Sequence, residues 1–240
     1  MAHSAQQINP WFGVGAATLV AALILGTLSV VAWNAPSAAT LNPSDWAALR
    51  FTVSQAILSA FLSVVLAVPV AKALSRRVFI GRNILITLLG APFLLPVIVA
   101  VMGLLAVFGR SGWVSDLLAL MGLPPIPIYG FHGVIIAHVF FNLPLATRII
   151  LQGWAGIPAE RFRLAAQLGF SSREITQHLE WPMLKRAVPG AFAIIFAICL
   201  SSFAVALTLG GGPRATTVEL AIYQAFRFDF DLGKAALLAS

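Results

Sequence analysis

Long apolar runs, separated by short polar segments, dominate the pattern of this chain. A helix needs about 20 apolar residues to cross the hydrocarbon core of a bilayer. The segment at 232–240, LGKAALLAS, predicts the start of a sixth span that is cut off by the chain end. The pattern therefore predicts an all-α, polytopic transmembrane helix bundle, with spans at about 14–33, 51–74, 84–107, 132–151 and 188–209.

The first apolar run has two interpretations. No Lys or Arg precedes it, and the run is long for the apolar part of a signal peptide, so we expect a retained membrane helix. The small residues near Ser37–Ala39 keep a cleaved signal peptide as the alternative. Between the third and fourth spans, the segment from Gly109 to Gly130 predicts a short surface helix at 113–121 in an outer loop.

Composition excludes a soluble protein. The 240 residues are 60% hydrophobic and only 10% charged, whereas about a quarter of the residues of a soluble domain are charged. A net charge of +7 is compatible with nucleic-acid binding, but in a membrane chain it indicates basic residues held on one side. The single cysteine, Cys199, excludes an internal disulfide framework and lies in an apolar run.

The distribution of basic residues predicts the orientation. With a cytoplasmic N-terminus, ten of the fifteen Lys and Arg residues fall on the inner side, namely Lys72, Arg76, Arg77, Arg82, Arg148, Arg161, Arg163, Arg173, Lys185 and Arg186. Cytoplasmic loops carry this excess in membrane proteins generally. We therefore expect a multi-pass membrane protein with its N-terminus in the cytoplasm.

Polar residues inside apolar spans are candidates for a substrate pathway, because such residues usually face a bundle interior. Four residues meet this description: Gln55, Asn142, Ser201 and Ser202. Hydrogen bonding between helices is the alternative role for each of them. His132 and His138 are six residues apart, which places them on different faces of a helix and argues against a metal site.

A polar segment at 163–185, RLAAQLGFSSREITQHLEWPMLK, interrupts the apolar pattern. Pro158 suits a first helical position, and Gly169 can adopt the left-handed conformation that ends a helix. Ser171 and Glu174 have the spacing of a capping box, and Pro182 is expected to close the unit. These residues predict a cytoplasmic helix–turn–helix, which is either an interfacial amphipathic hairpin or a docking element for a cytoplasmic partner.

The spacing in this segment resembles the "EAA" loop of type I, methionine-permease-like ABC importers. Ala165 matches the second Ala of that motif, Gly169 its Gly, Leu179 its Ile position and Pro182 its Pro. Three positions depart from it: Arg163 replaces Glu, Leu164 replaces Ala and Trp181 replaces Leu. The motif's Glu is therefore absent here, and its role cannot be carried over.

The resemblance extends over most of residues 94–226. The segments LPVIVAVMGLLAVFGRSGW, AHVFFNLPLATRIILQ, AAQLGF, EWP and LGGGPRATTVELAIYQA are similar to the thiamine/thiamine-pyrophosphate importer permeases. Ferric-iron permeases share the general layout and are the alternative; the segment GGGPRATTVELAIYQ favours thiamine. The resemblance implies a single permease domain over 1–240, with its core at about 51–240, that forms the first half of a tandem truncated in its sixth helix.

The resemblance also implies partners. The loop would form a coupling helix at about 163–172 that docks in a cytoplasmic ABC ATPase dimer through Arg163, Ala165, Ala166, Gly169, Phe170 and Ser171. A periplasmic substrate-binding protein would deliver the substrate, and a second permease half or protomer would complete the pathway. The resemblance implies no catalytic residue, cofactor, metal or nucleic acid for this chain, only a lipid membrane around it.

Three other functions are less consistent with the sequence: that of an ATPase, a secondary transporter, and a membrane anchor or assembly factor. The glycine-rich GGGPR at 210–214 lacks the pattern of a phosphate-binding P-loop, and we expect a flexible extracytoplasmic loop there and no ATP hydrolysis by this chain. A secondary transporter would use ionisable residues in the membrane, but no Asp or Glu lies at the centre of a predicted span. A membrane anchor or assembly factor would not require the polar segment at 163–185.

Overall fold

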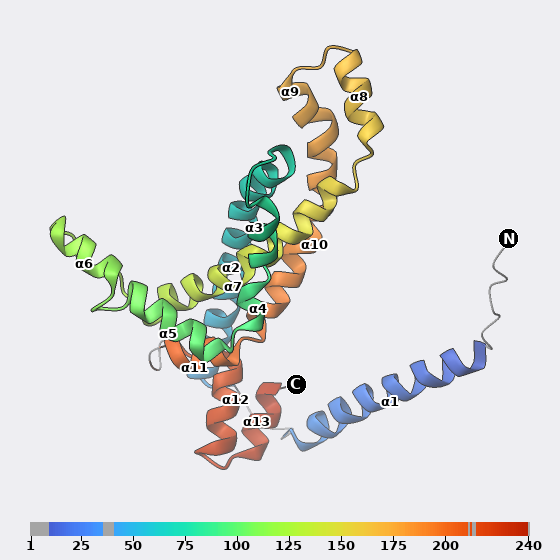
Figure 1. Cartoon of the computed structure of the whole chain (residues 1–240). Coiled ribbons are helices and arrows are strands. Elements are labelled where there is room, and N and C mark those ends of the chain that lie inside the picture. The colour runs from blue at the N-terminus through green and yellow to red at the C-terminus, as the bar shows by residue number, and fades with distance from the viewer. Residues whose placement is uncertain (1–9, 36–40, 211, 213–214, 240) are drawn as a thin grey trace. The chain divides into compact units, whose positions relative to one another are not determined.

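The computed structural model describes residues 10–35, 41–210, 212 and 215–239, in which all regular structure is helical (Figure 1). This confirms the predicted all-α class. In chain order the elements are α1 (Pro10–Asn34), α2 (Pro43–Arg76), α3 (Arg82–Leu88), α4 (Ala91–Leu94), α5 (Val97–Phe108), α6 (Trp113–Leu120), α7 (Phe131–Ala155), α8 (Ala159–Gln167), α9 (Ser172–Ile175), the π-helix η1 (Thr176–Glu180), α10 (Trp181–Leu200), α11 (Phe203–Leu209), α12 (Val218–Arg227) and α13 (Leu232–Ala239).

The chain divides into two compact units, which are described separately. The first consists of Met1–Asp45 and Ala221–Ser240, and in it α1 is exposed along most of its length. Within this unit Lys234 Nζ lies 3.4 Å from Asp45 Oδ1. The Asn42 backbone N–H donates to the other Asp45 oxygen at 2.9 Å, so Asp45 joins the start of α2 to α13.

The second unit, Trp46–Leu220, contains the candidate site. Its main core lies between α2, α7 and α10. The buried face of α2 carries small residues, including Ala56, Ala60, Ala67 and Ala71, and small residues allow membrane helices to approach closely. On α7 a Cβ at Gly153 would lie 2.7 Å from Met183 Sδ of α10. The three helices are therefore packed at short distance.

A second core cluster lies between α5, α7 and α11. Val101 and Leu104 of α5 contact Val134 of α7 and Leu209 of α11, and all four side chains are buried. The discontinuous helix pair α10–α11 therefore spans both clusters.

Five segments of the described residues are long and apolar enough to cross a membrane, which confirms the predicted number of spans. The chain is a multi-pass membrane protein. The five segments are Gly13–Trp33, Pro43–Arg76, Val97–Leu120, Phe131–Ala155 and Ser172–Leu200.

The predicted bounds of the third span are wrong. Residues 84–107 are not one helix but parts of α3, α4 and α5, and the segment able to cross runs from Val97 to Leu120. The cause is proline chemistry: Leu95, which precedes Pro96, is extended (φ −79°, ψ 134°), because a residue before proline is disfavoured in the helical region. The helix predicted at 113–121 exists as α6 and lies within the segment Val97–Leu120; its place in an outer loop stays a prediction.

The predicted bounds of the fifth span, 188–209, are also wrong. The helix that is long and apolar enough to cross begins at Ser172, well before residue 188, and it breaks after Leu200. Pro182 does not close the polar unit, because the chain remains helical through it. The ring of a proline clashes with the carbonyl four residues earlier in a regular helix. That residue is His178, which lies in the π-helix η1. The wider π-helical turn accommodates the proline ring, so the helix continues.

Some predictions remain open. Residues 232–239 form α13, and whether this helix begins a sixth span stays a prediction. The signal-peptide alternative near Ser37–Ala39 lies outside the described residues, as do Gly211, Pro213 and Arg214 of the predicted 210–214 loop.

Candidate functional site

The polar segment forms a helical hairpin in which α8 is followed by a tight turn and then α9. Gly169 has φ +72°, the left-handed conformation that glycine adopts without steric cost. Its backbone N–H donates to Ala166 O at 3.1 Å, and the Phe170 N–H donates to Ala165 O at 2.9 Å. These two bonds are those of a Schellman motif. The predicted left-handed turn at Gly169 is thus confirmed.

The second arm of the hairpin begins with the predicted capping box. Ser171 Oγ accepts a hydrogen bond from the Glu174 N–H, and Glu174 Oε2 accepts from the Ser171 N–H at 2.7 Å. The α8 arm differs by one residue from the expectation, since Pro158 precedes the helix as its N-cap rather than occupying its first position. From Ser172 the chain stays helical through η1 into α10. A displacement of the hairpin would therefore reach the membrane span directly.

The hairpin leaves apolar side chains uncovered. Leu164 of α8 and Leu168, the residue that caps the end of this helix, are 56% and 63% exposed. Of the predicted docking residues, Ala165 is buried, Phe170 is half-buried, and Arg163, Ala166, Gly169 and Ser171 are exposed. Figure 1 shows the hairpin extending beyond the end of α2 within the second unit. This face is available to a partner.

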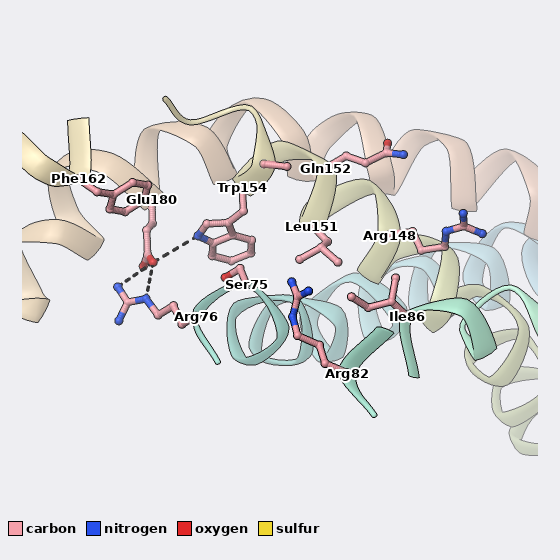
Figure 2. Close-up of a pocket in the computed structure, with 11 residues that line it drawn as sticks. Ser75, Arg76, Arg82, Ile86, Arg148, Leu151, Gln152, Trp154, Phe162 and Glu180 are labelled. Carbon is pink, nitrogen blue, oxygen red and sulfur yellow. Dashed lines mark hydrogen bonds and ion pairs between the residues drawn. The ribbon is translucent and has the colours of Figure 1, made fainter. Parts of the chain in front are cut away.

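Glu180, the last residue of η1, anchors the base of the hairpin. Its carboxylate is 1% exposed. Arg76 of α2 donates from Nε to Glu180 Oε1 at 2.7 Å, and Lys72 Nζ lies 3.3 Å from Oε2. The indole N–H of Trp154 on α7 donates to the same Oε1 at 3.3 Å (Figure 2). Three helices therefore meet at one buried carboxylate.

Thr176 adds a second link between η1 and α2. Its hydroxyl oxygen accepts from Lys72 Nζ at 3.2 Å and from Arg76 Nη2 at 3.3 Å, and its own proton goes to the Ser172 carbonyl. Lys72 and Arg76 of α2 thus each contact both Thr176 and Glu180 of the π-helix. The sequence analysis missed this cluster. Its only local signal is an acidic residue next to Trp181 and Pro182.

The predicted pathway residues Gln55 and Asn142 are brought together at Cys199 of α10. Gln55 Nε2 donates to the Cys199 carbonyl at 3.0 Å, and Asn142 Nδ2 lies 3.4 Å from Cys199 Sγ. The carbonyl is near the break between α10 and α11, so the Gln55 amide replaces a helical partner. Ser202 donates to the same carbonyl at 3.2 Å, whereas Ser201 is exposed and bonds within its own helix.

Gln55, Asn142 and Cys199 form a polar belt that also includes Ser59 of α2 and His138 of α7. Ser59 Oγ lies 3.3 Å from His138 Nδ1, and Asn142 Nδ2 also donates to the His138 carbonyl. Within the described part of the chain, the side-chain oxygens of Gln55 and Asn142 have no partner, nor does His138 Nε2. Hydrogen bonding between helices is therefore present at these residues, and it leaves acceptor groups unused.

Neither histidine of α7 is part of a metal cluster among the residues that the structure describes. His138 is buried and His132 is exposed, as expected from their different helix faces. In α12, burial raises the pKa of Glu219, and a hydrogen bond from the Phe203 backbone opposes that rise.

Sequence comparison finds relatives of the chain among transport proteins. It is 47% identical over 100% of its length to the thiamine transport system permease protein ThiP of Escherichia coli (strain K12). It is 42% identical over 96% of its length to ThiP of Brucella abortus (strain 2308). This chain is a relative of the thiamine transport permeases. It spans 46% and 44% of the lengths of these two proteins.

Comparison with solved structures supports the same fold. A chain of the bacterial alginate ABC transporter, crystallised with an alginate-bound periplasmic protein, superposes with a TM-score of 0.76 over 95% of this chain and 87% of that one. A second structure of an alginate-importing ABC transporter gives a TM-score of 0.71 over 97% of this chain and 92% of that one. Sequence identity is 15% in both cases, so the likeness shows the fold, that of ABC-importer permeases. No protein-family model matches the chain.

Proposed function

We propose that this chain is a membrane-spanning part of an ATP-driven importer that carries thiamine or thiamine pyrophosphate across the bacterial inner membrane. The observation that carries the proposal is the 47% identity to a thiamine permease over the full length of the chain. The fold, shared with a chain of an alginate ABC transporter, is consistent with it. The substrate, the N-terminus-inside orientation and the partners below are parts of this proposal.

The α8–α9 hairpin is the coupling element in this proposal, and residues 163–185 form the coupling loop. The exposed Leu164 and Leu168 supply an apolar contact surface, and Arg163, Ala166, Gly169 and Ser171 surround it on the same hairpin. The proposed partner is a separate ATPase, present as a dimer, that hydrolyses ATP in the cytoplasm. A periplasmic binding protein delivers the substrate to the opposite side of the membrane, and a second permease half or protomer completes the pathway.

The proposed mechanism transmits motion along continuous helix. When the ATPases close, they displace the hairpin, and α10 moves with it because no break separates Ser172 from Leu200. The Glu180 carboxylate makes α2 and α7 follow, through Arg76 and Trp154. Motion then reaches the break at Ser201–Ser202 and the polar belt of Gln55 and Asn142, which we assign to the substrate pathway. Discontinuous helices commonly line such pathways.

Purification of the complete transporter tests the proposed partnership. A tagged full-length permease should retain a separate subunit with ATP-binding motifs through mild detergent extraction, and the complex should hydrolyse ATP. A secondary transporter or a membrane anchor would retain no such subunit. Recovery of an active permease whose uptake needs an ion gradient and no ATP would contradict the proposal.

A further inference from the structure

A cationic cavity lies at the end of the second unit from which the hairpin extends. Its volume is about 610 Å³, and its walls come from α2, α3, α7 and α8 together with Glu180. Three arginines line it: Arg76, Arg82 and Arg148. Among the described residues, Glu180 is the only acid in the lining, and it is already paired with Arg76 and Lys72. The cavity thus has two further cations without a lining carboxylate to neutralise them.

Arg82 and Arg148 differ in their hydrogen bonding. Arg82 Nε donates to the Leu74 carbonyl at 2.7 Å, and its Nη1 lies 3.5 Å from Asn83 Oδ1, which leaves further N–H groups of a five-donor guanidinium. Arg148 is exposed, and no hydrogen bond or ion pair joins its guanidinium to the described residues. In Figure 2 it lies at the end of the cavity away from Glu180. Arg148 is therefore free to bind an anion.

A second, mainly apolar cavity adjoins the first at Arg148. Its volume is about 670 Å³, and it shares Ile86, Arg148 and Gln152 with the cationic cavity. Its other walls include Leu94 of α4 and Leu145 and Ile149 of α7. Gly90 permits the approach, since Arg148 Nη1 lies 3.2 Å from the position of a Cβ there. The combined space therefore has arginines at one end and apolar side chains of α4 and α7 at the other.

We propose that these adjoining cavities bind one anionic phospholipid. Its phosphate group would contact Arg82 and Arg148, and an acyl chain would lie along Leu94, Leu145 and Ile149. Free phosphate matches the arginines but leaves the apolar cavity unfilled, whereas an uncharged lipid fills the groove but leaves the arginines unpaired. Basic pockets between membrane helices bind anionic headgroups on the cytoplasmic side in general. The site does not depend on the transported substrate.

The test measures which lipid the full-length permease retains, in complex with its ATPase, by native mass spectrometry after equilibration with equal amounts of phosphatidylglycerol and phosphatidylcholine. The unmodified protein should retain phosphatidylglycerol in preference. Each arginine contributes about fivefold near a membrane surface, so Arg82→Gln with Arg148→Gln should lower the phosphatidylglycerol-to-phosphatidylcholine ratio about 25-fold. Arg148→Gln alone, which removes no hydrogen bond or ion pair to the described residues, should lower it about fivefold.

A matched control removes two charges outside the cavity. Arg77 and Arg186 are both exposed and do not line it, so Arg77→Gln with Arg186→Gln should leave the lipid ratio unchanged. Equal ratios in this control and in the Arg82/Arg148 variant would overturn the proposal. So would the absence of a preference in the unmodified protein, or displacement of phosphatidylglycerol by millimolar inorganic phosphate. Capture of another polypeptide segment by a photo-crosslinker at Thr87, in place of lipid, would overturn it as well.

Discussion

Gly169→Asp is expected to abolish uptake while the protein remains folded in the membrane. The backbone there is left-handed, with φ +72°, and a residue with a Cβ loses about 1–2 kcal/mol in that conformation. This loss is too small to unfold the helix bundle, but it acts on the Schellman turn and adds a negative charge to the proposed docking face. ATP-driven uptake should fall roughly tenfold or more, measured in vesicles at equal permease content by immunoblot.

Gly122 provides a matched control for this substitution. It has φ +70°, and a Cβ would meet no atom within 4 Å at either glycine. Gly122→Asp therefore carries the same backbone cost and the same added charge, but it lies outside the hairpin, just after α6. Uptake by Gly122→Asp should stay near that of the unmodified protein. Equal uptake by the two variants would remove the basis for assigning docking to the hairpin.

Glu180→Gln is expected to weaken both stability and coupling. Removing one partner of a fully buried ion pair costs about 3–5 kcal/mol. Arg76 and Lys72 are 35% and 36% exposed, so water compensates in part, and we expect the free energy of unfolding to fall by about 2 kcal/mol. Because Glu180 joins η1 to α2 and α7, uptake per ATP hydrolysed should fall as well. Thermal unfolding in detergent and parallel uptake and ATPase assays measure the two effects.

Two further variants separate coupling from general damage. Glu174 is an exposed carboxylate of the same arm whose hydrogen bonds stay within the capping box. Glu174→Gln should therefore have only a small effect on stability and leave the ratio of uptake to ATP hydrolysis unchanged. Adding Arg76→Gln to Glu180→Gln should restore part of the stability, because it removes a cation that had lost its partner. If Glu180→Gln behaves like Glu174→Gln, Glu180 has no coupling role.

The hairpin could be predicted from the sequence because its determinants are local. A Gly that ends one helix and a capping box that starts the next lie within six residues, from Gly169 to Glu174. The number of spans was predictable for the same reason, since the length and apolar character of each run can be read from that run alone. The bounds of the third and fifth spans were not, because they depend on how Pro96 and Pro182 are accommodated. A break follows Leu95, whereas a π-helical turn precedes Pro182.

The Glu180 cluster could not be predicted because its contacts are distant in sequence. Arg76 and Glu180 are separated by 104 residues, and nothing near Glu180 indicates that α2 returns to it. A glutamate in an exposed loop and a buried glutamate that joins helices can have the same neighbouring residues in the sequence. Gln55 and Asn142 were predictable as interior residues from their apolar surroundings, but their convergence on Cys199 follows from the packing of α2, α7 and α10. The exposure of Ser201 follows from the helix break.

The central claim is that ATP drives thiamine import through this fold, and uptake by the complete transporter tests it most directly. The full-length permease, its ATPase and its binding protein are reconstituted in vesicles and supplied with labelled thiamine. We predict uptake that requires ATP, persists without an ion gradient, and is reduced by unlabelled thiamine or thiamine pyrophosphate but not by ferric iron. Uptake of labelled iron in place of thiamine, or thiamine uptake that needs no ATP, would contradict the claim.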